Sequence, residues 1–198
     1  MTVTAADLDA VATQLGRTPR GVLDISYRCP DGAPGVVKTA PKLDDGTPFP
    51  TLYYLTDPRL TSEASRLEVA HVMKWMTARL ETDAELRADY QRAHEYFLAK
   101  RNAIEDLGTD FSGGGMPDRV KCLHVLIAYA LAEGPQHFRL GTEAVAMAAD
   151  HAGLRGHDDH GDHAHAAPSG RGSWQPRARA GQTATGCPSA RQRGRAPA

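Results

Sequence analysis

Residues 113–124 hold the densest group of side chains in the chain that could do chemistry. Three glycines and a Met-Pro pair precede two cations, a thiol and an imidazole. A thiol near a helix N-terminus, flanked by Arg119 and Lys121, has the surroundings that make a cysteine nucleophilic or metal-binding. The alternative for Cys122 is a small, buried structural side chain, because free cysteine is among the most buried residue types.

Helical spacing separates Cys122 from His124. The apolar pattern predicts a helix over residues 117–132, and residues two apart in a regular helix do not share a face. A local pair of this thiol and imidazole therefore requires the helix to begin late or to be distorted. Lys121 and His124, three apart, do share a face.

The glycine run before this helix is a candidate anion-binding loop. Backbone N–H groups at Gly114 and Gly115 could approach a phosphate or carboxylate, assisted by the helix dipole. Arg119 and Lys121 would then clamp the anion. The stretch matches neither the Walker motif nor the dinucleotide fingerprint. The alternative is a flexible linker with Pro117 as an ordinary first helical residue.

A second thiol, Cys29, lies in a turn rich in proline and glycine between two predicted strands. A turn cysteine followed by proline is common in metal sites. Asp57 follows another predicted strand and would approach Cys29 if the strands pair. The alternative for Asp57 is a turn or helix-capping residue.

Composition divides the chain into an acidic domain and a basic tail. Residues 1–150 contain 16 basic and 21 acidic residues, whereas residues 151–198 contain seven arginines and three aspartates. We predict one domain over residues 1–153 and a disordered tail over residues 154–198, first rich in His and then in Arg, Pro and Gly. The acidic domain argues against specific nucleic-acid binding, and the tail histidines predict only loose metal affinity.

Other sequence features indicate where in the cell the protein is located. No apolar run approaches the ~20 residues needed to span a bilayer, and residues 1–10 lack the charged and apolar regions of a signal peptide. The three cysteines are too few and too scattered for a disulfide framework. We therefore expect a cytoplasmic protein that does not enter a membrane. Its partners are unknown.

The hydrophobic patterns predict an α+β fold, with a small sheet of about three strands covered by four or five helices. The predicted strands are residues 22–27, 36–39 and 51–56. The predicted helices are residues 4–15, 59–80, 83–106, 117–132 and 141–151. Thr4 and Asp7 have the spacing of a capping box at the start of the first helix, with Asp in place of the preferred Glu.

Four stretches together resemble one bacterial family, domain of unknown function 501. They are residues 27–30, 47–58, 65–68 and 120–124, and the resemblance runs from about residue 18 to residue 151. The high alanine, glycine and arginine content is typical of an actinobacterial source. The family has no established activity, so the resemblance implies no reaction.

The resemblance does imply a ligand set. The family often has cysteine at the position of Asp57, so a family site would combine Cys29, position 57, Cys122 and His124. Thiolates and an imidazole suit zinc or an iron–sulfur cluster. Asp57 departs from this pattern, although a carboxylate also ligates zinc.

Three functions follow as hypotheses. The first is a protein that binds a metal ion or an iron–sulfur cluster through Cys29, Asp57, Cys122 and His124. The second is an enzyme that binds a phosphorylated small molecule at the loop of residues 113–121. The third is a protein-binding module that uses the charged helix of residues 83–106 and the tail.

Overall fold

The computed structural model of the chain describes residues 3–152. Within them lie three strands, six α-helices and one 3-10 helix, which confirms the predicted α+β class. In chain order the elements are α1 (Ala5–Leu15), β1 (Val22–Arg28), β2 (Pro34–Thr39), β3 (Tyr53–Leu55), α2 (Pro58–Val69), α3 (Val72–Thr82), α4 (Ala84–Asn102), α5 (Leu123–Glu133), η1 (Pro135–His137) and α6 (Arg139–Ala152). The predicted tail, residues 154–198, lies outside the described residues.

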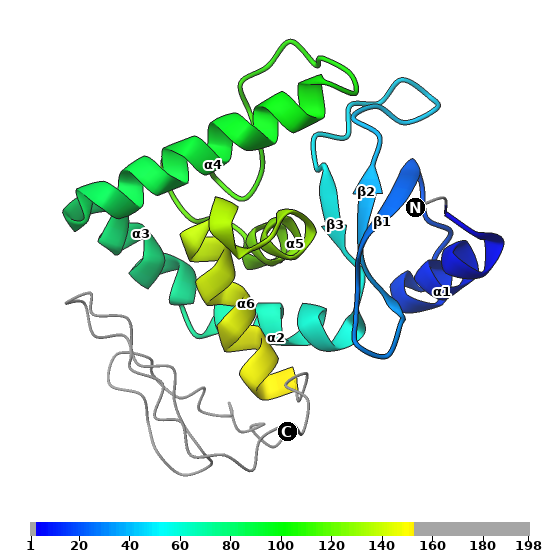
Figure 1. The fold of residues 1–198 in the computed structure, drawn as a ribbon, viewed down its shortest axis with the longest axis horizontal. Coiled ribbons are helices and arrows are strands. Elements are labelled where there is room, and N and C mark those ends of the chain that lie inside the picture. The colour runs from blue at the N-terminus through cyan, green and yellow to red at the C-terminus, as the bar shows by residue number, and fades with distance from the viewer. Residues whose placement is uncertain (1–2, 153–198) are drawn as a thin grey trace, which may run out of the picture.

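The strands form one antiparallel sheet in the order β1-β2-β3, covered on both faces. Successive residues of β2 point to opposite sides, as in any strand. Val36 packs into the large core with the helices, and Val37 packs with Val11 of α1 and Ile25 of β1. Figure 1 shows α1 on one side of the sheet and the other helices on the opposite side.

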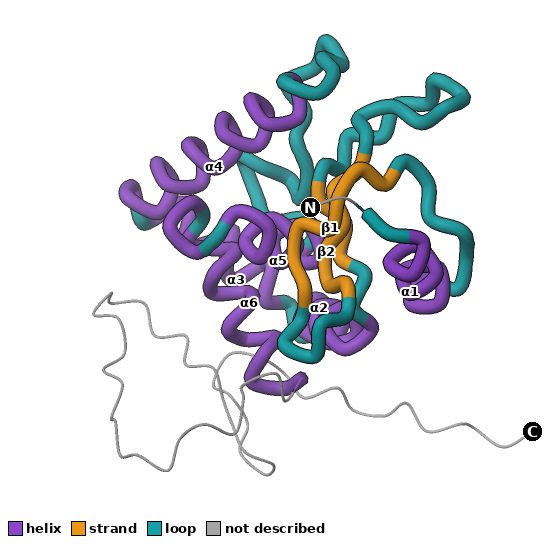
Figure 2. The backbone as a smooth tube through the Cα atoms, turned by 45° about the vertical axis from the view of Figure 1, so that its right-hand side comes forward, coloured by secondary structure: helices purple, strands orange, loops and turns teal. Residues whose placement is uncertain are grey.

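Helix α5 forms the centre of the larger core. Leu126, Ile127, Ala128 and Tyr129 are all fully buried. A helix that is apolar all round is expected inside a domain rather than on its surface. It lies between the sheet and helices α3, α4 and α6 (Figure 2). No helix in the described part of the chain is both long and apolar enough to cross a membrane.

The first helix forms as its sequence indicates. The Thr4 hydroxyl accepts a hydrogen bond from the Asp7 N–H at 3.1 Å, and the Asp7 carboxylate accepts one from the Thr4 N–H at 3.1 Å. These reciprocal bonds are the capping box that the spacing predicts. Gly16 ends the helix in the left-handed conformation, with φ 65°.

The long helix predicted over residues 59–80 is wrong, because the chain turns at His71. This residue has φ 64° and ψ 21°, the left-handed conformation, and separates α2 from α3. The apolar pattern hides the break, since Leu67 before it and Val72 after it are both buried in the same core. Two shorter helices therefore replace one, which raises the number of α-helices to six.

The helix predicted over residues 117–132 begins later than expected, at Leu123. Gly114 and Gly115 have φ values of 64° and 90°, and the residues around them form turns. Cys122 is extended, with φ −152° and ψ 118°. The apolar residue Val120 continues the helical pattern into a segment that is not helical, because it packs into the core from the loop.

His71 gives a test of the break between α2 and α3. A left-handed backbone is strained for any residue with a Cβ, and the His71 side chain makes no capping hydrogen bond. We expect His71→Gly to raise the free energy of unfolding by roughly 0.5–1 kcal/mol in urea denaturation. Gly16→Ala is the matched control: a Cβ there has nothing within 4 Å, so strain alone should lower the stability. Destabilisation by His71→Gly would contradict this account.

Candidate metal centre

Cys29 and Asp57 meet at one edge of the sheet. Strands β1 and β3 are both antiparallel to β2, so their C-terminal ends lie on either side of its start. The Cys29 thiol donates a hydrogen bond to Asp57 Oδ2 at 3.3 Å, and both residues are buried. The sequence-based expectation that Asp57 approaches Cys29 when the strands pair therefore agrees with the structure.

The missing side chain of Gly35 makes this contact possible. Gly35 lies near the start of β2, between the two strand ends, and its carbonyl accepts the Thr56 N–H at 2.9 Å. A Cβ on Gly35 would lie 2.9 Å from Cys29 Sγ and 2.8 Å from Cδ1 of Tyr27. Any side chain here would displace the cysteine, the tyrosine or the strand.

The Asp57 carboxylate is fully occupied by protein donors. Oδ1 caps α2 by accepting the N–H groups of Arg59 and Leu60 at 2.9 and 3.0 Å. Oδ2 accepts from the Cys29 thiol and from Arg59 Nη2 at 2.8 Å. Burial tends to raise the pKa of Asp57, but these hydrogen bonds outweigh it and hold the pKa below its ordinary value. Asp57 is therefore an ionised helix cap whose acceptor positions are already used.

Cys29 is the neutral partner in this pair. Burial, followed by the negative charge of Asp57, raises the pKa of the Cys29 thiol to about 12. In the protein without metal, the Cys29 thiol keeps its proton and donates a hydrogen bond to Asp57, whereas a nucleophile or metal ligand is the thiolate. The geometry makes Cys29 and Asp57 a structural pair.

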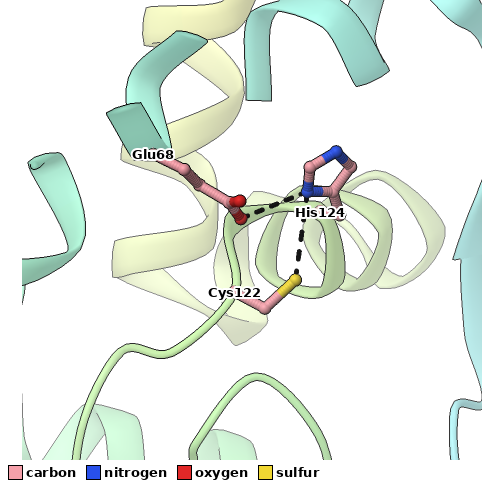
Figure 3. A group of neighbouring side chains, drawn as sticks. All are labelled: Glu68, Cys122 and His124. Atoms are coloured by element: carbon pink, nitrogen blue, oxygen red, sulfur yellow. Dashed lines mark hydrogen bonds and ion pairs between the residues drawn. The ribbon is translucent and has the colours of Figure 1, made fainter. Parts of the chain in front are cut away.

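Cys122 and His124 belong to a different group, which is completed by Glu68 (Figure 3). Glu68 comes from the last turn of α2, Cys122 is the N-cap of α5, and His124 is the second residue of α5. His124 Nδ1 lies 3.9 Å from Cys122 Sγ and 3.1 Å from Glu68 Oε1. One ligand atom from each residue lies within 4.8 Å of the other two.

The late start of α5 brings the thiol and the imidazole together. Helical spacing would separate Cys122 from His124, but the backbone of Cys122 is extended, and its sulfur points toward the His124 ring (Figure 3). The predicted four-ligand set is thus divided between two contacts. In the described part of the chain, no group of three close metal-ligating side chains includes Cys29 or Asp57.

Glu68 has a structural role at the same point. The Cys122 side chain makes no capping hydrogen bond to α5, and Glu68 Oε1 instead accepts the Leu123 N–H at 2.7 Å. A carboxylate at a helix N-terminus is also favoured by the helix dipole. One oxygen of Glu68 therefore binds both the start of α5 and the imidazole of His124.

The His124 ring is held from both of its nitrogens. Nε2 lies 3.3 Å from the Ser65 hydroxyl, one turn before Glu68 on α2. The contact with Cys122 raises the pKa of His124 to about 9, with a further contribution from Glu68 and against the effect of burial. The His124 side chain keeps 28% of its exposure, so the group is accessible from solvent.

The arrangement differs from a catalytic relay. In thiol–imidazole–carboxylate triads the nucleophile contacts one ring nitrogen and the carboxylate contacts the other. Here the sulfur of Cys122 and the oxygen of Glu68 both face Nδ1 of His124. Three ligand atoms that converge on one point suit a shared cation, whereas they do not suit proton transfer along a chain.

The predicted anion-binding residues separate into two pairs. Gly114 is buried, and a Cβ there would lie 2.6 Å from Cδ1 of Leu126. A Cβ on Gly115 would lie 2.6 Å from the carbonyl oxygen of Arg119. The two glycines thus allow the loop to pack closely, while Arg119 and Lys121 are exposed and line a surface groove beside α3.

Sequence reasoning missed Glu68 and Ser65 as members of this group. A signal was present, because residues 65–68 form one of the stretches that resemble the family. Ser65 and Glu68 are also three apart and so share a face of α2. What the sequence did not show was which other element this face meets.

A comparison with protein-family models matches residues 25–146 to the family described as Protein of unknown function (DUF501). The chain belongs to this family. The matched DUF501 span includes Glu68, Cys122 and His124, and also Cys29 and Asp57. No curated protein and no solved structure matches the chain.

The structural role of Asp57 gives the first prediction from this region. We expect Asp57→Ala to lower the free energy of unfolding by about 3 kcal/mol, because it removes a helix cap, leaves the buried Cys29 thiol without its acceptor, and leaves Arg59 with Asp31 as its remaining carboxylate partner. Asp83→Ala is the control, because Asp83 caps α4 through the single bond from the Leu86 N–H. It should cost only about 1 kcal/mol. Equal losses in urea denaturation would contradict the proposed difference.

The electrostatics of His124 give the second prediction. In metal-free protein, NMR titration should place the pKa of His124 near 9, and Cys122→Ser should lower it more than Glu68→Gln. Because the folded-state pKa lies above the ordinary 6.5, protonation of His124 stabilises the fold below pH 6.5. That contribution is lost as the pH rises through about 9. A wild-type pKa near 6.5 would show that the three groups do not interact as described.

Proposed function

We propose that this protein binds a divalent transition-metal ion, with zinc as the best fit, through Glu68, Cys122 and His124. The observation that carries the proposal is the convergence of a sulfur, a nitrogen and a carboxylate oxygen within 4.8 Å of one another. These are the three ligand types that zinc takes in proteins.

The distances support a tetrahedral ion. Zinc bonds of about 2.3 Å to sulfur and about 2.1 Å to nitrogen place those two ligand atoms about 3.6 Å apart, and a nitrogen and an oxygen ligand about 3.4 Å apart. The corresponding separations in the protein are 3.9 Å between Sγ and Nδ1 and 3.1 Å between Nδ1 and Oε1. Each of these two separations is within about 0.3 Å of its tetrahedral value, and Sγ and Oε1 also lie within 4.8 Å of each other.

The contacts behind the ligands also support it. A histidine that ligates a metal through one nitrogen usually hydrogen-bonds through the other, which fixes the ring. With Nδ1 facing the other ligands, Nε2 of His124 contacts the Ser65 hydroxyl. Glu68 is likewise oriented by the Leu123 N–H.

The ligand set favours a single ion over an iron–sulfur cluster. Clusters are held mainly by several cysteine thiolates, and this group supplies one. Cys29, the other described thiol, keeps its proton for Asp57. Three protein ligands leave the fourth tetrahedral position for water or a substrate, as in catalytic zinc sites. Both described cysteines are free thiols, which fits the cytoplasmic location expected from the sequence.

Cobalt binding tests the proposal, because a thiolate–cobalt bond gives a near-ultraviolet charge-transfer band that histidines alone do not produce. We expect full-length protein carrying Cys187→Ser, prepared without a tag under anaerobic conditions, to show this band with one equivalent of Co²⁺. Cys122→Ser should abolish the band. Glu68→Gln and Ser65→Ala should each weaken binding, the second by about 10–100-fold.

The control variants separate the competing explanations. Cys29→Ser should retain the band, whereas the four-ligand set implied by the family resemblance requires its loss. If cobalt binds but the thiolate–cobalt charge-transfer band is absent, we would assign the bound ion to the tail histidines, which lie outside the described residues. A band that survives Cys122→Ser, or no band in the parent protein, would refute the proposed site.

A further inference from the structure

A groove of about 460 Å³ runs between α3 and the non-helical segment of residues 119–121. Its size falls within the range of about 300–1,000 Å³ that small-molecule sites occupy. The lining residues are Met73, Lys74, Thr77, Ala78, Glu81, Arg119, Val120 and Lys121. None of them is a ligand of the proposed metal site.

The groove is positively charged on an otherwise acidic domain. Lys74, Arg119 and Lys121 are exposed and contribute three positive charges, and Glu81 contributes one negative charge. Within the described residues, none of these three cations is paired with a carboxylate, whereas Arg79 on the same helix is paired with Glu143. Three cations without a protein counter-ion leave a net charge of +2 on one small surface.

The wall that carries Arg119 and Lys121 is held in place by hydrogen bonds. The Thr77 hydroxyl accepts the Val120 N–H at 3.0 Å and donates to the Met73 carbonyl at 2.9 Å. The Tyr90 hydroxyl donates to the Arg119 carbonyl at 3.1 Å. The backbone of residues 119–120 is therefore fixed against α3 and α4 before any ligand arrives.

We propose that this groove binds a small organic molecule that carries a phosphate monoester. A dianionic phosphate balances the net charge of the groove, and an arginine guanidinium can bind two phosphate oxygens at once. The organic part lies against the apolar lining formed by Met73, Ala78 and Val120. Side chains bind the anion here, rather than the N–H groups of the glycine loop.

This inference is independent of the metal site, so each can fail without the other. Lys121 and Cys122 are neighbours in the chain, but the groove needs no metal. Binding should therefore persist in Cys122→Ser protein, and all titrations can be done in that background as well as in the parent protein.

Titration with phenyl phosphate at pH 8, followed by NMR of the backbone amides in the full-length protein, tests the proposal. We expect saturable binding with shifts in α3 and residues 119–121, and weaker binding of inorganic phosphate because it lacks the ring. Arg119→Ala should weaken phenyl phosphate binding at least about tenfold, as loss of a charge-assisted bidentate contact implies. Lys74→Ala should act in the same direction.

Arg92→Ala on α4 is the matched control, because it removes an exposed positive charge that does not line the groove. It should leave the affinity within about twofold, since exposed charges are screened at physiological salt beyond about 8 Å. Three outcomes would overturn the proposal: no saturable shifts, equal losses from Arg92→Ala and Arg119→Ala, or tighter binding of benzoate than of phenyl phosphate.

Discussion

The hydrogen bonds accepted by Glu68 connect the fold of this protein to its candidate site. Helix α5 is the buried centre of the large core, yet the residue at its N-cap provides no acceptor for the first helical N–H groups. Unpaired N–H groups at a helix start are costly when buried. Glu68 supplies the acceptor from the end of α2, and the same oxygen contacts His124. The contact that positions α5 thus also assembles the three ligands.

The molecule contains two places where a carboxylate lies near a thiol, and their surroundings give them different roles, one structural and one as a candidate metal site. Asp57 is buried, its oxygens are occupied by two backbone N–H groups, Arg59 and a thiol, and it caps a helix. Cys29 beside it stays protonated because it is buried next to a negative charge. Glu68 accepts hydrogen bonds from fewer donors than Asp57 does. The thiol of Cys122 lies beside His124, and the imidazole of His124 can exchange a proton for a metal ion. The first arrangement stabilises the sheet edge, and the second leaves ligand positions available.

Much of the fold could be predicted from local patterns. The three strands, the capping box of α1 and the apolar character of α5 depend on residues close together in the chain, and all are confirmed. The break at His71 was not predictable, because a non-glycine residue in the left-handed conformation leaves no clear mark when the apolar pattern continues on both sides. The late start of α5 was hidden for a similar reason, since Val120 is buried without being helical.

The candidate site was predicted only in part, for the same physical reason. Cys122 and His124 stand out by their chemistry, but helical periodicity implied that they point apart. Their approach depends on an extended residue at the helix start and on a carboxylate from an element about 55 residues earlier, which Glu68 provides. Such a contact is set by how α2 packs on α5, and no local pattern encodes that packing. The family motif at residues 65–68 indicated an important stretch without identifying its partner.

X-ray absorption spectroscopy of the full-length protein with one equivalent of zinc tests the central claim most directly, because it counts the sulfur atoms bound to the ion. The account predicts one sulfur at about 2.3 Å, with nitrogen and oxygen ligands at about 2.0–2.2 Å completing the shell. A spectrum with no sulfur ligand, or with two or more sulfur ligands per zinc, would contradict a site formed by Glu68, Cys122 and His124.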